Sequence, residues 1–260
     1  MKNKKKKITI IVIALLLILG AIWLSRRSLN PDSKLATNLY SYLGTNDLNV
    51  CGGLNNYADE LVSSEDLSED LKICSAYTRV SENDITTMKI DKSKKNNTCS
   101  INNDIVFATD NYEDDICTVT KIDAKKINDE YKTIYGSDIK ENQKFQYNST
   151  TVCYYSEDAY YCGLGESYTY TIGAEPHTYR SIKQVKKSSN KIIIYDYFLK
   201  IVNDECYGSF TTDKTIDKCN DEYNSNKMDY KFLKKYGTLY KHTYQKNGKN
   251  YYWVSSEPVD

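Results

Sequence analysis

The sequence has little of what catalytic and zinc-binding proteins use. It contains two histidines, His177 and His242, and no Cys-x-x-Cys pair. A zinc site or a general base of ordinary pKa would therefore need one of those two imidazoles. No G-x-S-x-G, H-E-x-x-H or phosphate-binding glycine loop occurs. We expect a protein that is not an enzyme, without catalytic residues, metal site or cofactor.

Acidic residues are missing from the first 27 positions, although 35 Asp and Glu balance 35 Lys and Arg over the whole chain. Seven basic residues lie in that stretch, so residues 28–260 hold 28 basic against 35 acidic residues and carry a net charge of minus seven. Binding to duplex nucleic acid requires several Lys and Arg that displace counterions from phosphates. A net-acidic body argues against a nucleic-acid partner.

One long hydrophobic run extends from Ile8 to Leu24, with only Thr9 and Gly20 outside the apolar class. As a helix its seventeen residues span about 26 Å, and the flanking Lys and Arg side chains can reach the headgroups. A cleaved secretory signal is the alternative. Its apolar region is normally shorter and ends in a small-x-small site, for which Leu19 is too large.

The basic residues orient this segment, because five Lys precede it and two Arg follow it. We predict an N-terminus in the cytoplasm and a body outside it. The predicted parts are a cytoplasmic tail at 1–7, an uncleaved anchor in the lipid bilayer at 8–24, a linker at 25–32 and an extracytoplasmic body at 28–260.

All eight cysteines follow residue 50 and so lie in the part of the chain predicted to be outside the cytoplasm. In that oxidising environment eight cysteines indicate up to four disulfides. Glu157-Asp158 as a two-residue turn would set Cys153 opposite Cys162. Eight buried free thiols are the alternative. The economical scheme pairs each cysteine with the next: Cys51 with Cys74, Cys99 with Cys117, Cys153 with Cys162, and Cys206 with Cys219.

Residues 33–90 form the predicted helical part of the body. A helix begins at Asp32 or Ser33, which can cap it, and a polar, lysine-rich loop covers 89–97. Three apolar stripes at helical spacing lie between them: Leu35, Leu39, Tyr42 and Leu43; Leu54, Tyr57, Ala58 and Leu61; Leu67, Leu71, Cys74 and Tyr77. The bridge from Cys51 to Cys74 would pin the second helix to the third.

Residues 98–260 form the predicted α+β part. Asp123 caps its clearest helix and Gly136 ends it, and 18 of the 25 tyrosines lie between Tyr147 and Tyr252, where the apolar period changes to two. The strands we expect cover 101–107, 116–122, 145–155, 159–164, 168–172, 177–186, 191–202, 206–211, 240–246 and 249–255.

The last two strands form a predicted hairpin, since Asn247-Gly248 is the favoured type I′ dipeptide. This turn sets Lys246 opposite Lys249, Tyr244 opposite Tyr251, and His242 opposite Trp253. One face then carries five residues that we regard as a candidate binding surface, and Tyr252 and Val254 take the other. The five are Tyr240, His242, Tyr244, Tyr251 and Trp253.

The predicted fold class is α+β: a single transmembrane helix, short helices, then a Tyr-rich, mainly antiparallel sheet packed on a helix. From about Asp123 this layout resembles cystatin-like or NTF2-like ectodomains of bacterial envelope proteins, and it implies no function. We expect a non-catalytic envelope module that binds a peptide, a glycan or a partner protein. The alternatives are a structural assembly subunit and a hydrolase using the loop carboxylates Glu113-Asp114-Asp115, Glu157-Asp158 or Asp204-Glu205.

Overall fold

The computed structural model describes residues 28–43, 50–51, 56–92, 98–101, 105–109, 115–165 and 176–259. The predicted cytoplasmic tail, the predicted anchor at 8–24 and the start of the predicted linker lie outside these residues. The helices within these ranges all fall short of the length and hydropathy of a membrane span. The fold is α+β with antiparallel sheets, as the sequence predicts.

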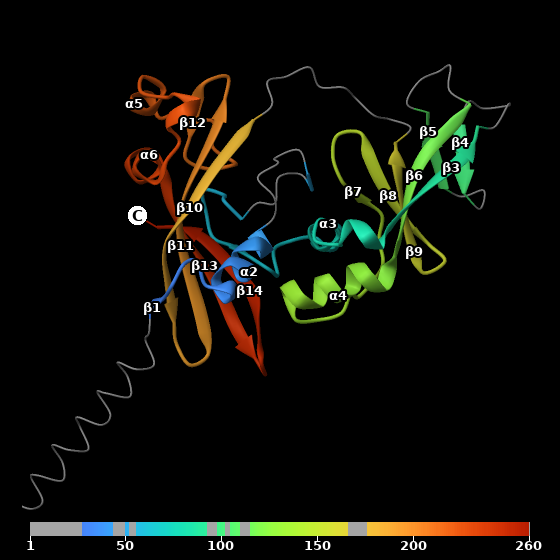
Figure 1. Cartoon of the computed structure of the whole chain (residues 1–260), viewed down its shortest axis with the longest axis horizontal. Coiled ribbons are helices and arrows are strands. Elements are labelled where there is room, and N and C mark those ends of the chain that lie inside the picture. The colour runs from blue at the N-terminus through green and yellow to red at the C-terminus, as the bar shows by residue number, and fades with distance from the viewer. Residues whose placement is uncertain are drawn as a thin grey trace, which may run out of the picture.

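A seven-stranded antiparallel sheet forms one end of the molecule, in the order β1-β10-β11-β13-β14-β2, with β12 paired to β11 (Figure 1). Its strands are β1 (Ser28–Leu29), β2 (Val62–Ser63), β10 (His177–Lys187), β11 (Lys191–Val202), β12 (Glu205–Tyr207), β13 (Thr238–Asn247) and β14 (Asn250–Pro258). The helices beside it are α2 (Lys34–Tyr40), η1 (Ser41–Leu43), α5 (Asp217–Asn220), η3 (Ser225–Lys227) and α6 (Tyr230–Tyr236).

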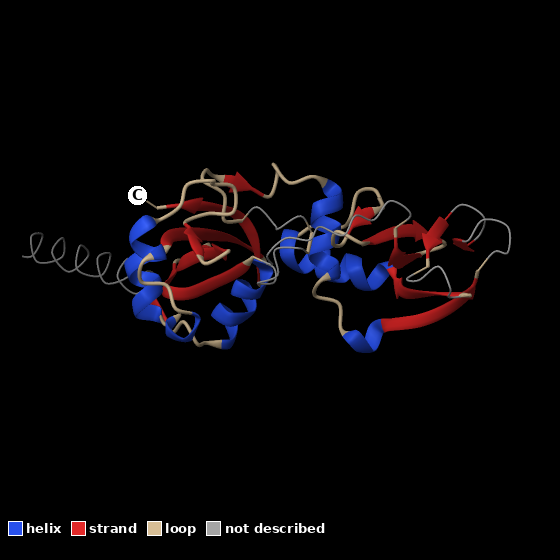
Figure 2. Ribbon diagram, turned by 90° about the horizontal axis from the view of Figure 1, so that it is seen from above, coloured by secondary structure: helices blue, strands red, loops and turns tan. Residues whose placement is uncertain are grey.

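A second, five-stranded sheet in the order β3-β6-β9-β8-β7 and a two-stranded sheet β4-β5 form the other end. Their strands are β3 (Ile85–Asp91), β4 (Thr98–Ile101), β5 (Ile105–Ala108), β6 (Ile116–Asp123), β7 (Phe145–Gln146), β8 (Thr151–Ser156) and β9 (Ala159–Leu164). Helices α3 (Glu69–Tyr77) and α4 (Ala124–Tyr135) lie between the two ends, and η2 (Glu82–Asp84) precedes β3 (Figures 1 and 2). The expectation of one sheet is therefore wrong.

The helix caps follow the sequence signals closely. Ser33 precedes α2, and its side chain accepts a hydrogen bond from the backbone N–H of Ala36. Asp123 caps α4 by accepting from the N–H of Lys125 at 2.8 Å, and Gly136 ends that helix at φ +78°. Both helix starts and the left-handed stop were predicted from these residue types.

The predicted second helix is wrong, because Asn56 and Tyr57 form a turn and β2 follows at Val62. Tertiary contacts override the stripe: the Tyr57 ring stacks on Phe198 with centroids 4.2 Å apart, and the Tyr57 carbonyl accepts from Phe210. Gly52-Gly53 and Leu54 lie outside the described residues. The predicted lysine-rich loop is also wrong at its start, since β3 continues to Asp91 and pairs with β6, across the predicted boundary between the two parts of the body.

Three predicted strands are shorter than expected, and a fourth, at 168–172, lies outside the described residues. The stretch 145–155 is interrupted because the Asn148 side chain accepts from the N–H groups of Thr150 and Thr151, which forms a turn. The stretch 101–107 contributes to the β4-β5 pair, and the strand expected at 206–211 ends at Tyr207. Helix α6 was not predicted; Asp229 caps it by accepting from the N–H of Phe232.

The register of the last hairpin also needs correction. Asn247 pairs with Asn250, Lys246 with Tyr251 and Tyr244 with Trp253, and a bulge after Thr243 places His242 opposite Ser256. The loop is Gly248-Lys249, with φ +62° at Gly248, as the first central position of a type II′ turn requires. Near the turn the pairing moved by two residues, an even number, so Tyr244, Tyr251 and Trp253 still share a face; beyond the bulge the partner of His242 moved by three.

All four disulfides join the cysteines that the spacing predicts: Cys51–Cys74, Cys99–Cys117, Cys153–Cys162 and Cys206–Cys219. Cys153 and Cys162 are direct partners across β8 and β9. Cys51 lies in a turn at φ +54°, so its bridge ties that turn to α3 rather than joining two helices. Four disulfides indicate an oxidising, extracytoplasmic location.

Candidate functional site

The hairpin face predicted as a candidate binding surface lies in the core. Its five residues are between 0% and 8% exposed, because α2, α4 and the Tyr57 segment cover that side of the sheet. The residues are Tyr240, His242, Tyr244, Tyr251 and Trp253. They cannot form an open contact surface, although Tyr251 reaches the wall of a cleft described below.

A buried hydrogen-bonded network is centred on Asp196 of β11, which is 0% exposed. One carboxylate oxygen lies 2.8 Å from Nε2 of His242, a neighbour on β13 that is also 0% exposed. The other oxygen accepts from the hydroxyls of Tyr40 at 2.5 Å and Tyr57 at 2.8 Å. Burial, followed by the charge of Asp196, raises the pKa of Tyr57, so this hydroxyl stays protonated as a donor.

The network continues through His242 to Ser256, in an order that resembles an Asp-His-Ser triad. Nδ1 of His242 lies 2.6 Å from Oγ of Ser256, and this oxygen also accepts from Nε1 of Trp253 at 3.0 Å. A nucleophile must reach its substrate, but Ser256 is 1% exposed. Nη1 of Arg180 on β10 also donates to the Tyr57 hydroxyl at 3.5 Å. The network therefore joins α2, the Tyr57 turn and four strands of the sheet, and it stabilises the fold.

The loop carboxylates are exposed in tight turns. Glu157 and Asp158 have φ of +48° and +60° and form the tip of one hairpin. Asp204, at φ +64°, lies at the tip of another, and the exposed Glu205 begins β12 beside it. Asp115 is exposed and Glu113-Asp114 lies outside the described residues; His177 is exposed at the start of β10. Nowhere in the described ranges do three or more His, Cys, Asp or Glu gather as a metal site.

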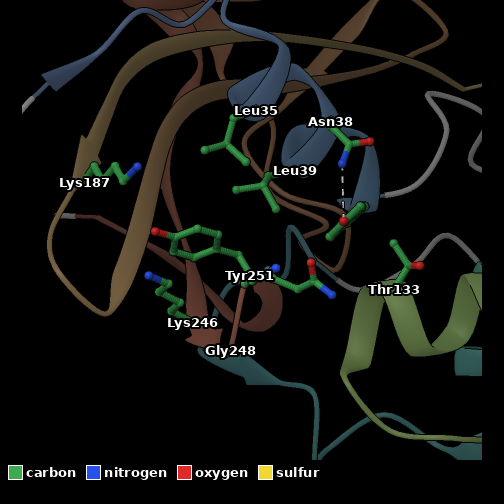
Figure 3. Close-up of a pocket in the computed structure, with 11 residues that line it drawn as sticks. Leu35, Asn38, Leu39, Thr133, Lys187, Lys246, Gly248 and Tyr251 are labelled. Atoms are coloured by element: carbon green, nitrogen blue, oxygen red, sulfur yellow. Dashed lines mark hydrogen bonds between the residues drawn. The ribbon is translucent and has the colours of Figure 1, made fainter.

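A cleft of about 570 Å³ lies beside the tips of the β10-β11 and β13-β14 hairpins and is the candidate site. This volume is within the range of ligand pockets. Helix α2 contributes an apolar floor of Leu35 and Leu39, and α4 contributes Thr133 (Figure 3). The remaining lining residues are Asn38, Tyr42, Lys187, Lys246, Gly248, Lys249, Asn250 and Tyr251.

Three lysines give the cleft a positive rim, and among the described residues that line it none is acidic. The ring of Tyr251 extends toward Lys187 and Lys246 (Figure 3). The N–H of Lys246 donates to the carbonyl of Asn190 at 2.8 Å, which holds the two hairpin tips together. This arrangement can take a ligand that has both apolar groups and negative charge.

The sequence did not reveal this cleft, because its lining comes from α2, η1, α4 and two hairpins that are far apart in the chain. One signal was available: lysines flank both predicted hairpin turns, at Lys187 and Lys191 and at Lys246 and Lys249. Which side of the sheet they share with α2 follows only from the tertiary fold.

Comparisons with known proteins find no matching family model, curated protein or solved structure. The resemblance to cystatin-like or NTF2-like ectodomains stays a prediction.

Proposed function

We propose that this protein is a single-pass, membrane-anchored, extracytoplasmic binding module that acts without catalysis. Its ligand is a peptide segment of a partner protein that carries acidic and apolar side chains. The observation behind this proposal is the cleft of about 570 Å³ with an apolar floor and a rim of Lys187, Lys246 and Lys249. Carboxylates of the peptide would pair with the lysines, and an apolar side chain would pack on Leu35, which is half-buried.

The composition of the cleft favours a peptide over a glycan. Proteins bind sugars through exposed aromatic faces, whereas Tyr42 and Tyr251 are only 6% and 8% exposed. The hydrolase alternative would need two carboxyl groups that share a cleft, and the described acidic pairs lie in exposed turns.

The proposed anchor is the apolar segment 8–24, with residues 1–7 in the cytoplasm and 28–260 outside. The four disulfides support the outside location of the body. Thiol labelling of intact cells tests the orientation. We expect all eight cysteines to be labelled only after a reductant is added outside, and labelling that requires lysis would contradict it.

Selection of peptides from a random displayed library, with the full chain in zwitterionic nanodiscs as bait, tests the ligand class. We expect selected peptides to combine Asp or Glu with large apolar residues and to bind less tightly at high salt. Because each exposed ion pair contributes about 0.2 to 1 kcal/mol, replacing all three rim lysines with Gln should weaken binding by roughly tenfold.

The matched control replaces the exposed lysines Lys214 and Lys218, which lie beyond the opposite end of β11, and should leave peptide affinity unchanged. Leu39→Ala would create a cavity and could act through stability, so affinity is read only for variants that melt like the native protein. Peptides without acidic residues, or equal affinity of the rim and control variants, would refute the peptide-binding proposal.

A further inference from the structure

We propose that the outer face of the β1-β10-β11 edge rests on the anionic headgroups of the bilayer that the anchor enters. This inference depends on the proposed anchor but not on the proposed cleft ligand. The partner is the phosphate-bearing lipid surface itself. The contact surface, called here the basic edge, consists of Ser28, Lys183, Gln184, Lys186, Lys191 and Ile193.

The basic edge is distinct from the cleft because it lies on the other face of the sheet. Lys186 pairs with Ile193, whereas Lys187 pairs with Ile192, whose side chain is 0% exposed in the core. Successive residues of a strand point to opposite faces. A shallow concavity of about 480 Å³ marks the outer face beside Ser28, Lys186 and Lys191. Lys187, at the end of β10, lines both this concavity and the cleft, so the two sites meet at that residue.

The charge of the basic edge is unbalanced, in contrast to the net-acidic body. Lys183, Lys186 and Lys191 are exposed, and within the described part of the chain none of them forms an ion pair. The concavity beside them has no acidic lining residue among those described. An anionic bilayer attracts each lysine near its surface by a factor of roughly five in binding.

Tyrosines beneath these lysines give the basic edge an interfacial character. The ammonium group of Lys186 lies 4.8 Å from the ring centroid of Tyr195, and that of Lys183 lies 5.5 Å from that of Tyr197. Aromatic rings next to cationic side chains are typical of protein surfaces at the level of lipid headgroups.

Covalent geometry keeps the basic edge close to the membrane. Ser28 pairs directly with Lys186 at the edge of the sheet (Figure 1). Four chain steps separate Leu24, the last residue of the apolar segment, from Ser28, and at about 3.6 Å per residue they span at most about 14 Å. The headgroup layer is about 5 to 7 Å thick and surface charge acts over a further 8 Å or so, which brings the lysines within its range.

The test measures the reactivity of single lysines in the reconstituted full chain. The protein is placed in vesicles of phosphatidylcholine alone or with about one third phosphatidylglycerol, and lysines are methylated with formaldehyde, a neutral reagent, and borane. Mass spectrometry gives the rate at each lysine. We expect Lys186 and Lys191 to react at least fivefold more slowly in anionic vesicles, and 0.5 M KCl to restore their rates.

Lys214 and Lys218 are the internal controls, because they are exposed and follow the far end of β11, about 36 Å from Lys191 along the strand. Their rates should change less than twofold between the vesicles. In a Lys186→Glu/Lys191→Glu variant, Lys183 should become as reactive in anionic as in neutral vesicles. Lys214→Glu/Lys218→Glu should leave the protection of Lys186 intact.

Flotation separates the two ways in which the proposal can fail. A full chain that does not float with neutral vesicles after an alkaline wash lacks the anchor, and both proposals about the membrane then fall. A chain that floats but shows equal reactivity of Lys186 in both vesicles refutes the basic edge and leaves the anchor standing. Binding of library peptides in the cleft is unaffected in either case.

Discussion

The buried carboxylate of Asp196 should be the most sensitive single group for stability. It is 0% exposed and accepts hydrogen bonds from Tyr40, Tyr57 and His242. In Asp196→Ala three donors lose their acceptor, two of them on the buried residues Tyr57 and His242, and each unsatisfied buried donor costs about 1 to 3 kcal/mol. Breaking a buried polar pair by truncating one partner typically costs about 3 to 5 kcal/mol, so we expect a loss of about 4 kcal/mol in the free energy of unfolding.

Asp196→Asn separates charge from hydrogen bonding. The amide oxygen can accept from the two tyrosine hydroxyls, and the amide NH₂ can donate to Nε2 of His242 if the other ring nitrogen carries the proton toward Ser256. All hydrogen bonds then persist without their charge-assisted strength, which leaves an expected loss of about 2 kcal/mol.

Denaturation of residues 28–260 in urea, with the disulfides intact, measures both losses. This segment contains all four disulfides and one tryptophan, Trp253, whose indole N–H bonds to Ser256 within the same network. Glu60→Ala is the control, because Glu60 is exposed and should shift stability by less than about 0.5 kcal/mol. A loss below about 1 kcal/mol for Asp196→Ala, or a larger loss for the Asn variant than for the Ala variant, would refute the reasoning.

Three further predictions use the same unfolding assay. Gly136→Ala should lower the free energy of unfolding by about 2 to 3 kcal/mol, because the residue has a left-handed φ of +78° and an added Cβ would lie only 2.8 Å from the Tyr252 ring. Gly248→Ala should lower it by only about 1 kcal/mol, because φ is +62° but no atom lies within 4 Å of the added Cβ. Equal losses for the two variants would contradict the clash. Tyr240→Phe should lower stability by about 1 to 2 kcal/mol, because the Tyr240 hydroxyl donates to backbone carbonyls. Tyr244→Phe should be neutral or stabilising, because the buried Tyr244 hydroxyl has no hydrogen-bond partner in the described part of the chain. A larger loss for Tyr244→Phe than for Tyr240→Phe would contradict this difference. Burial raises the pKa of Tyr240 and Tyr244 above the ordinary value of about 10. Their contribution to stability is therefore complete below that pH and is lost as the pH rises further. Absorbance at 295 nm should show tyrosines that ionise only when the protein unfolds, and ionisation of these tyrosines in the folded protein would contradict the prediction.

Local signals in the sequence were sufficient wherever a pattern decides the structure by itself. Helix α4 has its cap at Asp123 and its stop at Gly136, and strands β9 and β11 have the predicted bounds. The disulfide pairings followed from spacing because each cysteine lies near its partner in the chain.

Predictions failed where distant segments decide the outcome. The stripe through Tyr57 has helical spacing, but stacking on Phe198 and the bond to Asp196 fix this segment as a turn. The hairpin face was assigned correctly as a set, because period-two alternation determines which residues share a side. The sequence predicts a sheet packed on a helix, but it contains no signal that shows which face of the hairpin α4 covers.

The cleft was not predicted from the sequence either, because its lining residues come from separate elements of the fold. Lysines at hairpin turns ordinarily indicate solvent-exposed tips. Here they form part of a candidate ligand site only because α2 places the apolar residues Leu35 and Leu39 beside them. No pattern within one element contains that information. Sites assembled from several elements are therefore the part of a fold that a single sequence predicts least.

The disulfide pattern has a consequence for export. Every bridge joins a cysteine to the next one in the chain, over separations of 23, 18, 9 and 13 residues. A chain that crosses the membrane from its N-terminal end presents its cysteines one pair at a time, so an oxidase that simply links successive thiols as they arrive would produce the native set. The protein would then mature correctly in a cell envelope that has an oxidising enzyme but no isomerase.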